Sequence, residues 1–185
     1  MEVLESVLPG DKISKKGRFS LGIHNSRAYL AGNLIHLSPS KYFISSKTNR
    51  YSPSIDDLVI GKIIYTSPEY YKLDLGGCVG YLPSLSFPNA TKRNRPELKH
   101  GDWVFCRVVR VCAEPLLTCI GKGLGPLVGD VFPIPCWKIR SFYLTDYLNK
   151  IGKNYKFMIA LGLNGWVWIS SESALTVREV YNLIK

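Results

Sequence analysis

The stretch from Asp57 to Thr66 reads DLVIGKIIYT, and it decides how the middle of the chain folds. Apolar and β-branched residues dominate it, which predicts a long strand. A Ser-Pro-Glu turn follows, and residues 70–75 (YYKLDL) predict a second strand. Three further strands are expected over residues 78–85, 103–111 and 116–120. Five strands with glycine-marked turns predict a small closed barrel of the OB type over residues 52–122.

The segments on either side of the barrel predict two different small domains. Residues 1–51 alternate short apolar runs with turns, which indicates an N-terminal β-domain with strands over residues 27–30, 34–37 and 42–45. Residues 123–185 predict, in order, a strand, one helix or two short ones, a hairpin and a final helix. Counted as two helices, that order is the order of a KH-type domain. The fold class is therefore mainly β with an α+β C-terminal domain.

Composition narrows the classes of partner. The net charge of +10 favours an anionic partner, although basic charge can also serve solubility alone. The best apolar run, residues 157–163, is far shorter than the roughly 20 residues of a membrane span, so no membrane association is expected. Five cysteines without a C-x-x-C pair favour reduced thiols in the cytosol or nucleus, with no structural zinc.

Short motifs along the whole chain resemble those of the cap proteins of the RNA exosome, which combine an N-terminal β-domain, an S1-type barrel and a KH-type domain. The motifs are residues 7–11 (VLPGD), 50–53 (RYSP), 57–61 (DLVIG), 85–87 (LSF), 90–96 (ATKRNRP) and 162–168 (GLNGWVW). The run over residues 90–96 is the most specific of these, and it resembles the ribosomal RNA-processing protein 40 type of cap subunit.

The resemblance implies a non-catalytic subunit that guides single-stranded RNA into a channel for 3'-5' degradation and processing. It implies RNase PH-like ring subunits and other cap subunits as partners, and an exonuclease subunit as an indirect one. It also implies a location in the nucleus, the nucleolus and the cytoplasm. No cofactor is expected.

A basic loop is the first candidate for RNA contact. Residues 52–122 carry nine basic and seven acidic side chains, yet three of the positive charges fall within four residues, at Lys92, Arg93 and Arg95. Phosphates attract such a loop, and arginine can bind them through two hydrogen bonds. The alternatives are a solvated loop or one that pairs with acidic groups on a neighbouring subunit.

The strand over residues 70–75 supplies the second candidate. Alternation places Tyr71 and Leu73 on one face, expected to be the core, and Tyr70 and Lys72 on the other. S1-type barrels often present aromatic side chains on the face where bases stack. A lysine at this place favours contact with the RNA backbone and little sequence preference.

The third motif, Gly162-Leu163-Asn164-Gly165, is interpreted as structural. A KH domain clamps nucleic acid with a Gly-x-x-Gly loop between its first two helices. Here that junction, residues 142–146, has no glycine and contains an acid, whereas Gly162, Asn164 and Gly165 join two strands. A turn that needs positive φ explains them, and they are expected to help pack the KH unit against the barrel.

No motif supports catalysis. The three histidines lie in unrelated contexts, and no nucleophile elbow, phosphate loop or metalloprotease motif occurs. Asp56 and Asp57 could be imagined as a metal pair, but at the start of a strand they indicate turn chemistry. The rival interpretations are a purely structural adaptor of the exosome ring without RNA affinity and a ribosome-associated S1/KH protein.

Overall fold

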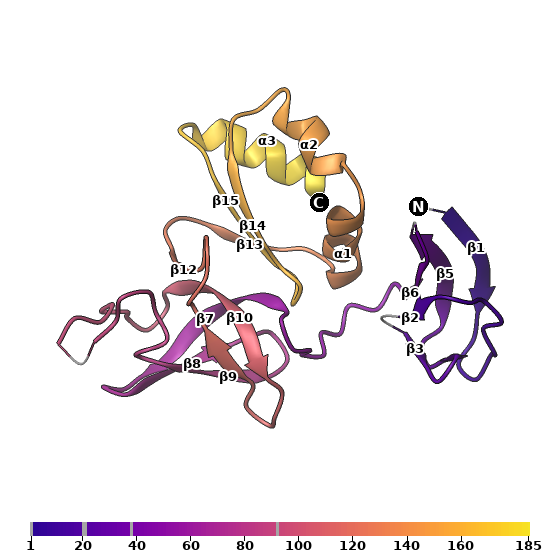
Figure 1. The fold of residues 1–185 in the computed structure, drawn as a ribbon. Coiled ribbons are helices and arrows are strands. Elements are labelled where there is room, and N and C mark those ends of the chain that lie inside the picture. The colour runs from indigo at the N-terminus through magenta and orange to yellow at the C-terminus, as the bar shows by residue number, and fades with distance from the viewer. Residues whose placement is uncertain (1, 20–21, 38, 92) are drawn as a thin grey trace. The chain divides into compact units, whose positions relative to one another are not determined.

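The computed structural model describes residues 2–19, 22–37, 39–91 and 93–185 (Figure 1). The chain forms two compact units, Met1–Thr48 and Asn49–Lys185. The domain boundaries predicted after residues 51 and 122 stay predictions. In the described ranges no helix has both the length and the apolar character needed to cross a membrane.

The first unit is all β. Its main sheet has the order β1-β5-β6-β2, with strands β1 (Glu2–Val7), β5 (Gly32–Leu37), β6 (Lys41–Ser45) and β2 (Arg18–Phe19). A hairpin of β3 (Ile23–His24) and β4 (Arg27–Ala28) turns through Asn25 and Ser26. Both turn residues have positive φ, as a two-residue hairpin turn of type I′ requires. The buried core consists of Val7, Ile13, Ile23, Ala28, Leu34 and Ile44.

The barrel opens the second unit. Its strands are β7 (Leu58–Thr66), β8 (Tyr70–Asp74), β9 (Val79–Pro83), β10 (Trp103–Arg110) and β11 (Leu116–Thr118). Antiparallel pairs join β10, β7, β8 and β9, a parallel pair joins β9 to β11, and an antiparallel pair of β11 with β10 closes the ring. A further short strand, β12 (Gly125–Leu127), pairs with the start of β10. The predicted five-strand barrel is confirmed.

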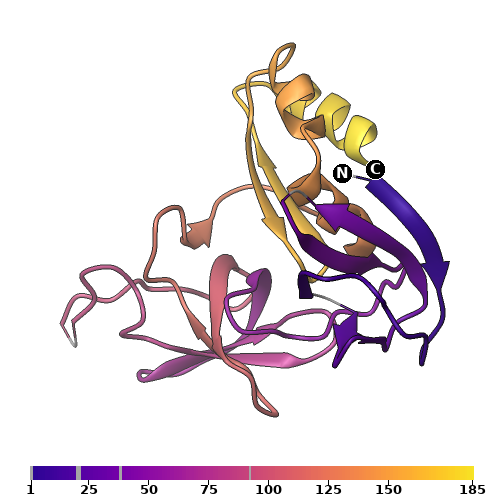
Figure 2. The ribbon, with the colours of Figure 1, turned by 45° about the vertical axis from the view of Figure 1, so that its right-hand side comes forward.

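The KH-type part follows in the predicted element order. It contains β13 (Val131–Pro133), α1 (Cys136–Leu144), α2 (Tyr147–Gly152), β14 (Met158–Gly162), β15 (Trp166–Ser170) and α3 (Ala174–Ile184). The residues between the first strand and the hairpin thus form two short helices. The sheet order is β13-β15-β14, and the helices cover one of its faces (Figure 2).

The other face of this sheet packs on the barrel. Alternate residues of β15 divide between the two faces: Val167 and Ile169 face the helices, whereas Trp166 and Trp168 belong to a separate cluster with β7 and β10. That cluster buries Ile60 of β7 and Phe105 of β10. Strand β7 is therefore covered twice, because Val59 and Ile63 point into the barrel core. The barrel therefore covers part of the second face of the KH-type sheet, while Met158 of β14 remains exposed.

Candidate nucleic-acid interface

Three tyrosines gather on the outer face of the barrel, one on each of three neighbouring strands. Tyr70 of β8 stacks on Tyr81 of β9 with ring centroids 4.9 Å apart, and Tyr65 of β7 lies 5.8 Å from Tyr70 on the other side. About half of the Tyr65 surface is exposed, and the other two are partly exposed. We call Tyr65, Tyr70 and Tyr81 the tyrosine face. Exposed aromatic rings in a row are the arrangement on which successive bases stack.

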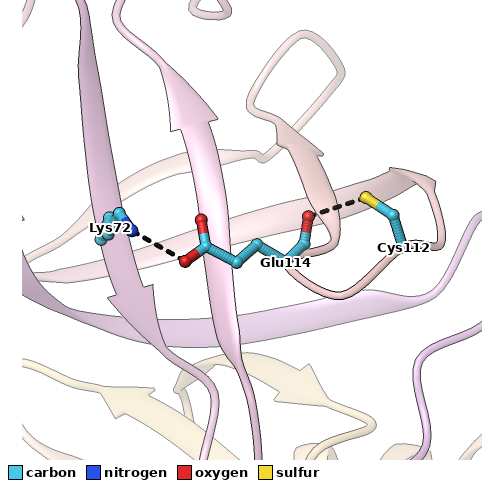
Figure 3. A network of polar contacts seen from close by, with 3 residues as sticks. All are labelled: Lys72, Cys112 and Glu114. Atoms are coloured by element: carbon cyan, nitrogen blue, oxygen red, sulfur yellow. Dashed lines mark hydrogen bonds and ion pairs between the residues drawn. The ribbon is translucent and has the colours of Figure 1, made fainter.

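Lys72 lies at the centre of the tyrosine face. In the strand register it is opposite Tyr65 on one side and Tyr81 on the other. Its ammonium group forms an ion pair of 2.7 Å with Glu114, which comes from the connection between β10 and β11 (Figure 3). The hydrogen bond to Glu114 raises the pKa of Lys72. Lys72 thus has the predicted outward position, and its charge is paired with Glu114 of the same chain.

The rest of β8 follows the predicted alternation. Tyr71 is buried, as expected, and its ring makes an edge-on contact with Phe87. Its hydroxyl donates a 2.6 Å hydrogen bond to the carbonyl of Pro96. This bond fixes the end of the basic loop beside the turn that joins β7 to β8.

The basic loop itself is exposed. Lys92 lies outside the described residues. Arg93 is exposed, and the guanidinium of Arg95 donates a hydrogen bond to the carbonyl of Pro68 in the β7–β8 turn. Arg95 also lines a cavity of about 280 Å³ with that turn. The loop therefore lies at the end of the barrel where Tyr65 and Tyr70 flank the same turn.

The predicted structural motif lies elsewhere, at the junction of the KH-type hairpin with the barrel. The side chain of Asn164 is buried; its Oδ1 accepts from the Ile60 N–H (3.1 Å), and its Nδ2 donates to the carbonyls of Ile60 (2.8 Å) and Leu75 (3.0 Å). Leu163 N–H donates to the carbonyl of Leu58. Together they occupy the edge of β7 that β8 does not reach.

Gly162 and Gly165 are required in this turn for two different structural reasons. Gly165 has a φ of 94°, which fits the expected turn conformation. Positive φ was the wrong explanation for Gly162 and for Asn164, because neither backbone adopts that conformation. A Cβ on Gly162 would lie 2.5 Å from Asn164 Oδ1 and 2.8 Å from Ile60 N. Gly162 is needed because the hairpin approaches β7 too closely for a side chain.

Asp56 and Asp57 form a turn. Asp57 Oδ2 accepts hydrogen bonds from the Tyr51 hydroxyl and the Ser54 N–H, both at 2.9 Å, while Asp56 lies 3.9 Å from Arg107. Burial raises the pKa of the Asp57 carboxyl, and its hydrogen bonds act in the opposite direction. Within the described residues no group of three or more His, Cys, Asp or Glu side chains could hold a metal ion.

Sequence reasoning did not select Tyr65, Tyr81 or Glu114. Tyr81 could have been found, because Gly80 and Leu82 alternate with it as the buried residues of β9. Tyr65 follows a β-bulge between Ile63 and itself, which changes the face on which its side chain emerges. Glu114 is 42 residues from Lys72, and no local pattern marks that pairing.

Comparison with known proteins agrees with this architecture. Residues 51–125 match the family described as exosome complex component RRP40, S1 domain, and residues 129–175 match the KH-domain family. A crystal structure of a "putative exosome complex RNA-binding protein" matches with a TM-score of 0.61 at 25% identity, covering 73% of this chain and 86% of that one.

Two relatives have similar sequences over most of the chain. A Dictyostelium discoideum protein named "Putative exosome complex component rrp40" is 35% identical, covering 96% of this chain and 84% of its own length. Exosome complex component rrp40 of Schizosaccharomyces pombe is 33% identical, covering 84% of this chain and 70% of its own length. By these similarities, the chain belongs to the RRP40 family of exosome complex components.

Proposed function

We propose that this protein is a non-catalytic, RNA-binding cap subunit of the RNA exosome. It guides single-stranded RNA toward the central channel for 3'-5' degradation and processing. The main support for RNA binding is the tyrosine face, which lies beside the basic loop. The exposed parts of the three rings offer stacking to bases. Arg95 binds the turn between Tyr65 and Tyr70, and Arg93 is exposed in the same loop, where both can attract phosphates.

Family membership supports the partners of this proposal. These are RNase PH-like ring subunits, the other cap subunits and, indirectly, an exonuclease subunit. The protein acts with them in the nucleus, the nucleolus and the cytoplasm. The KH-type part contributes packing to the barrel, since the hairpin that carries Asn164 is buried against β7.

RNA binding is expected to be weak, salt-dependent and nearly independent of sequence. With two to three phosphates neutralised, the log–log salt slope is expected to be about −1.5 to −2.5 for a single strand. Fluorescence titration with a single-stranded oligonucleotide measures this. Tyr70→Ala or Tyr81→Ala should each weaken binding by about 1–3 kcal/mol. Unchanged affinity in both variants would remove the tyrosine face from the proposal.

A structural adaptor without RNA affinity is the second candidate. It is favoured by the fact that Lys72 and Arg95 already bind groups of the protein itself. Affinity purification from cell extract, combined with the RNA titration, distinguishes the RNA-binding cap subunit from the adaptor. Recovery of ring subunits without any RNA affinity would establish the adaptor, and recovery of ribosomal proteins without ring subunits would contradict both.

A further inference from the structure

The backbone around Glu114 is held by two hydrogen bonds, in addition to the ion pair that its side chain forms with Lys72. The Cys112 thiol donates to the Glu114 carbonyl at 2.9 Å (Figure 3), and Tyr81 N–H donates to the carbonyl of the next residue, Pro115, at 2.9 Å. The first contact lies within the β10–β11 connection, and the second holds that connection beside β9. The Glu114 carboxylate therefore lies beside Lys72, between Tyr65 and Tyr81 of the tyrosine face.

The Glu114 carboxylate binds the same ammonium group, that of Lys72, that an RNA phosphate on this face would bind. Lys72 is flanked in register by Tyr65 and Tyr81, so a base stacked on either ring brings its phosphate near this ammonium group. In the free protein that ammonium already pairs with Glu114 at 2.7 Å. The side chains are 33% and 44% exposed, which makes the pair accessible to a competing anion.

We infer that Glu114 sets the RNA affinity of the tyrosine face by competing with phosphate for Lys72. This inference rests on the proposed function. Glu114 is an affinity-determining residue that acts on RNA only through its ion pair with Lys72. While it holds Lys72, the face offers stacking without charge neutralisation. An RNA strand gains the lysine only by displacing the carboxylate.

Glu114→Gln tests the inference because glutamine keeps the shape and an acceptor oxygen but not the charge. Titration with a fluorescent oligouridylate at about 50 mM salt should show binding tightened roughly two- to fivefold. The salt slope should become more negative by about 0.7, the contribution of one additional phosphate contact on a single strand. A role of Glu114 in stability alone would not change that slope.

Two controls assign the effect. Glu179→Gln changes the net charge equally on α3, which packs on the helix-covered face of the KH-type sheet, and should leave affinity nearly unchanged. In a Lys72→Met background, Glu114→Gln should give no gain. The inference is overturned if Glu114→Gln does not tighten binding, or if it tightens binding equally without Lys72.

The outcomes also separate this inference from the proposed function. If Tyr70→Ala weakens binding while Glu114→Gln changes nothing, the competition is wrong and the tyrosine face stands. If neither the tyrosine variants nor Glu114→Gln alters affinity, the proposed RNA face and the competition are both wrong.

Discussion

The side-chain amide of Asn164 pairs with both backbone groups of Ile60, 104 positions earlier in the chain. Accepting from the N–H and donating to the carbonyl of one residue is what an opposing strand does in an antiparallel ladder. A single side chain thus replaces a missing strand at the edge of β7. This joins the barrel and the KH-type hairpin by buried hydrogen bonds as well as by apolar packing.

Removing this amide should destabilise the second unit. Asn164→Ala leaves the N–H and carbonyl of Ile60 and the carbonyl of Leu75 without the bonds it supplied, and we expect the free energy of unfolding to fall by about 2–4 kcal/mol. Urea denaturation measures the change. Asn154→Ala, at an exposed position, is the matched control and should cost under about 0.5 kcal/mol. Equal midpoints for both variants would contradict the role given to Asn164.

The glycines of the same turn should affect stability and not RNA affinity. Gly162→Ala places a Cβ against Ile60 N, and Gly165→Ala strains a residue at positive φ. Each should lower the free energy of unfolding by about 1 kcal/mol or more. Gly77→Ala, where a Cβ meets nothing within 4 Å, is the control in thermal melts. A normal melting temperature combined with abolished RNA binding would instead indicate that the turn clamps RNA.

The basic loop should affect RNA capture and not folding. Replacing Lys92, Arg93 and Arg95 with alanine should weaken binding and make the salt slope less steep by about 0.7 for each phosphate that the loop no longer neutralises. Stability should change by under about 0.5 kcal/mol per exposed residue. Replacing Lys150, Lys153 and Lys156 removes the same charge from exposed positions near α2. Equally weakened binding in the two triple variants would attribute the effect to net charge alone.

Alkaline pH should weaken the KH-type part through Tyr143. Its hydroxyl donates to the Leu161 carbonyl at 2.7 Å, and burial, with a smaller contribution from Asp57, raises the pKa of Tyr143 to about 12. Because the folded pKa exceeds the unfolded value of about 10, the contribution to stability is present below pH ~10. It is lost as pH rises toward 12.

Melting temperatures between pH ~9 and pH ~12 measure this effect. Tyr143→Phe should show a shallower decline than the unmodified protein, and the difference should be small because nearly half of the residue's surface is exposed. Parallel declines for the two proteins would show that the Tyr143 hydroxyl does not titrate differently on unfolding.

Alternation and turn residues predicted the barrel strands and the KH-type order because those elements carry their own local pattern. Strand β12 was missed, since Gly125–Leu127 has little strand character and forms by pairing with β10. Tyr65 shows a different difficulty. Strict alternation from Val59 and Ile63 places it in the core, and only the bulge before it turns it outward.

The candidate site was predictable to the extent that it follows one strand. The outward positions of Tyr70 and Lys72 come from the alternation of β8 alone. The ion pair of Lys72 with Glu114 and the bond of Arg95 to Pro68 depend on how the closed barrel places distant segments. Such contacts are properties of the three-dimensional closure and leave no local trace in the sequence.

The distance in sequence between Ile60 and Asn164 has a consequence for how the protein is made. During synthesis the barrel strands emerge first, and about a hundred further residues must be made before Asn164 can bind Ile60 at the edge of β7. Contacts of such long range are formed late and slow the folding of the unit that needs them. In a nascent chain that ends before the hairpin, the backbone groups at this edge of β7 should therefore be unpaired and able to bind other strands. Once Asn164 has been synthesised and binds Ile60, that edge is no longer available to them.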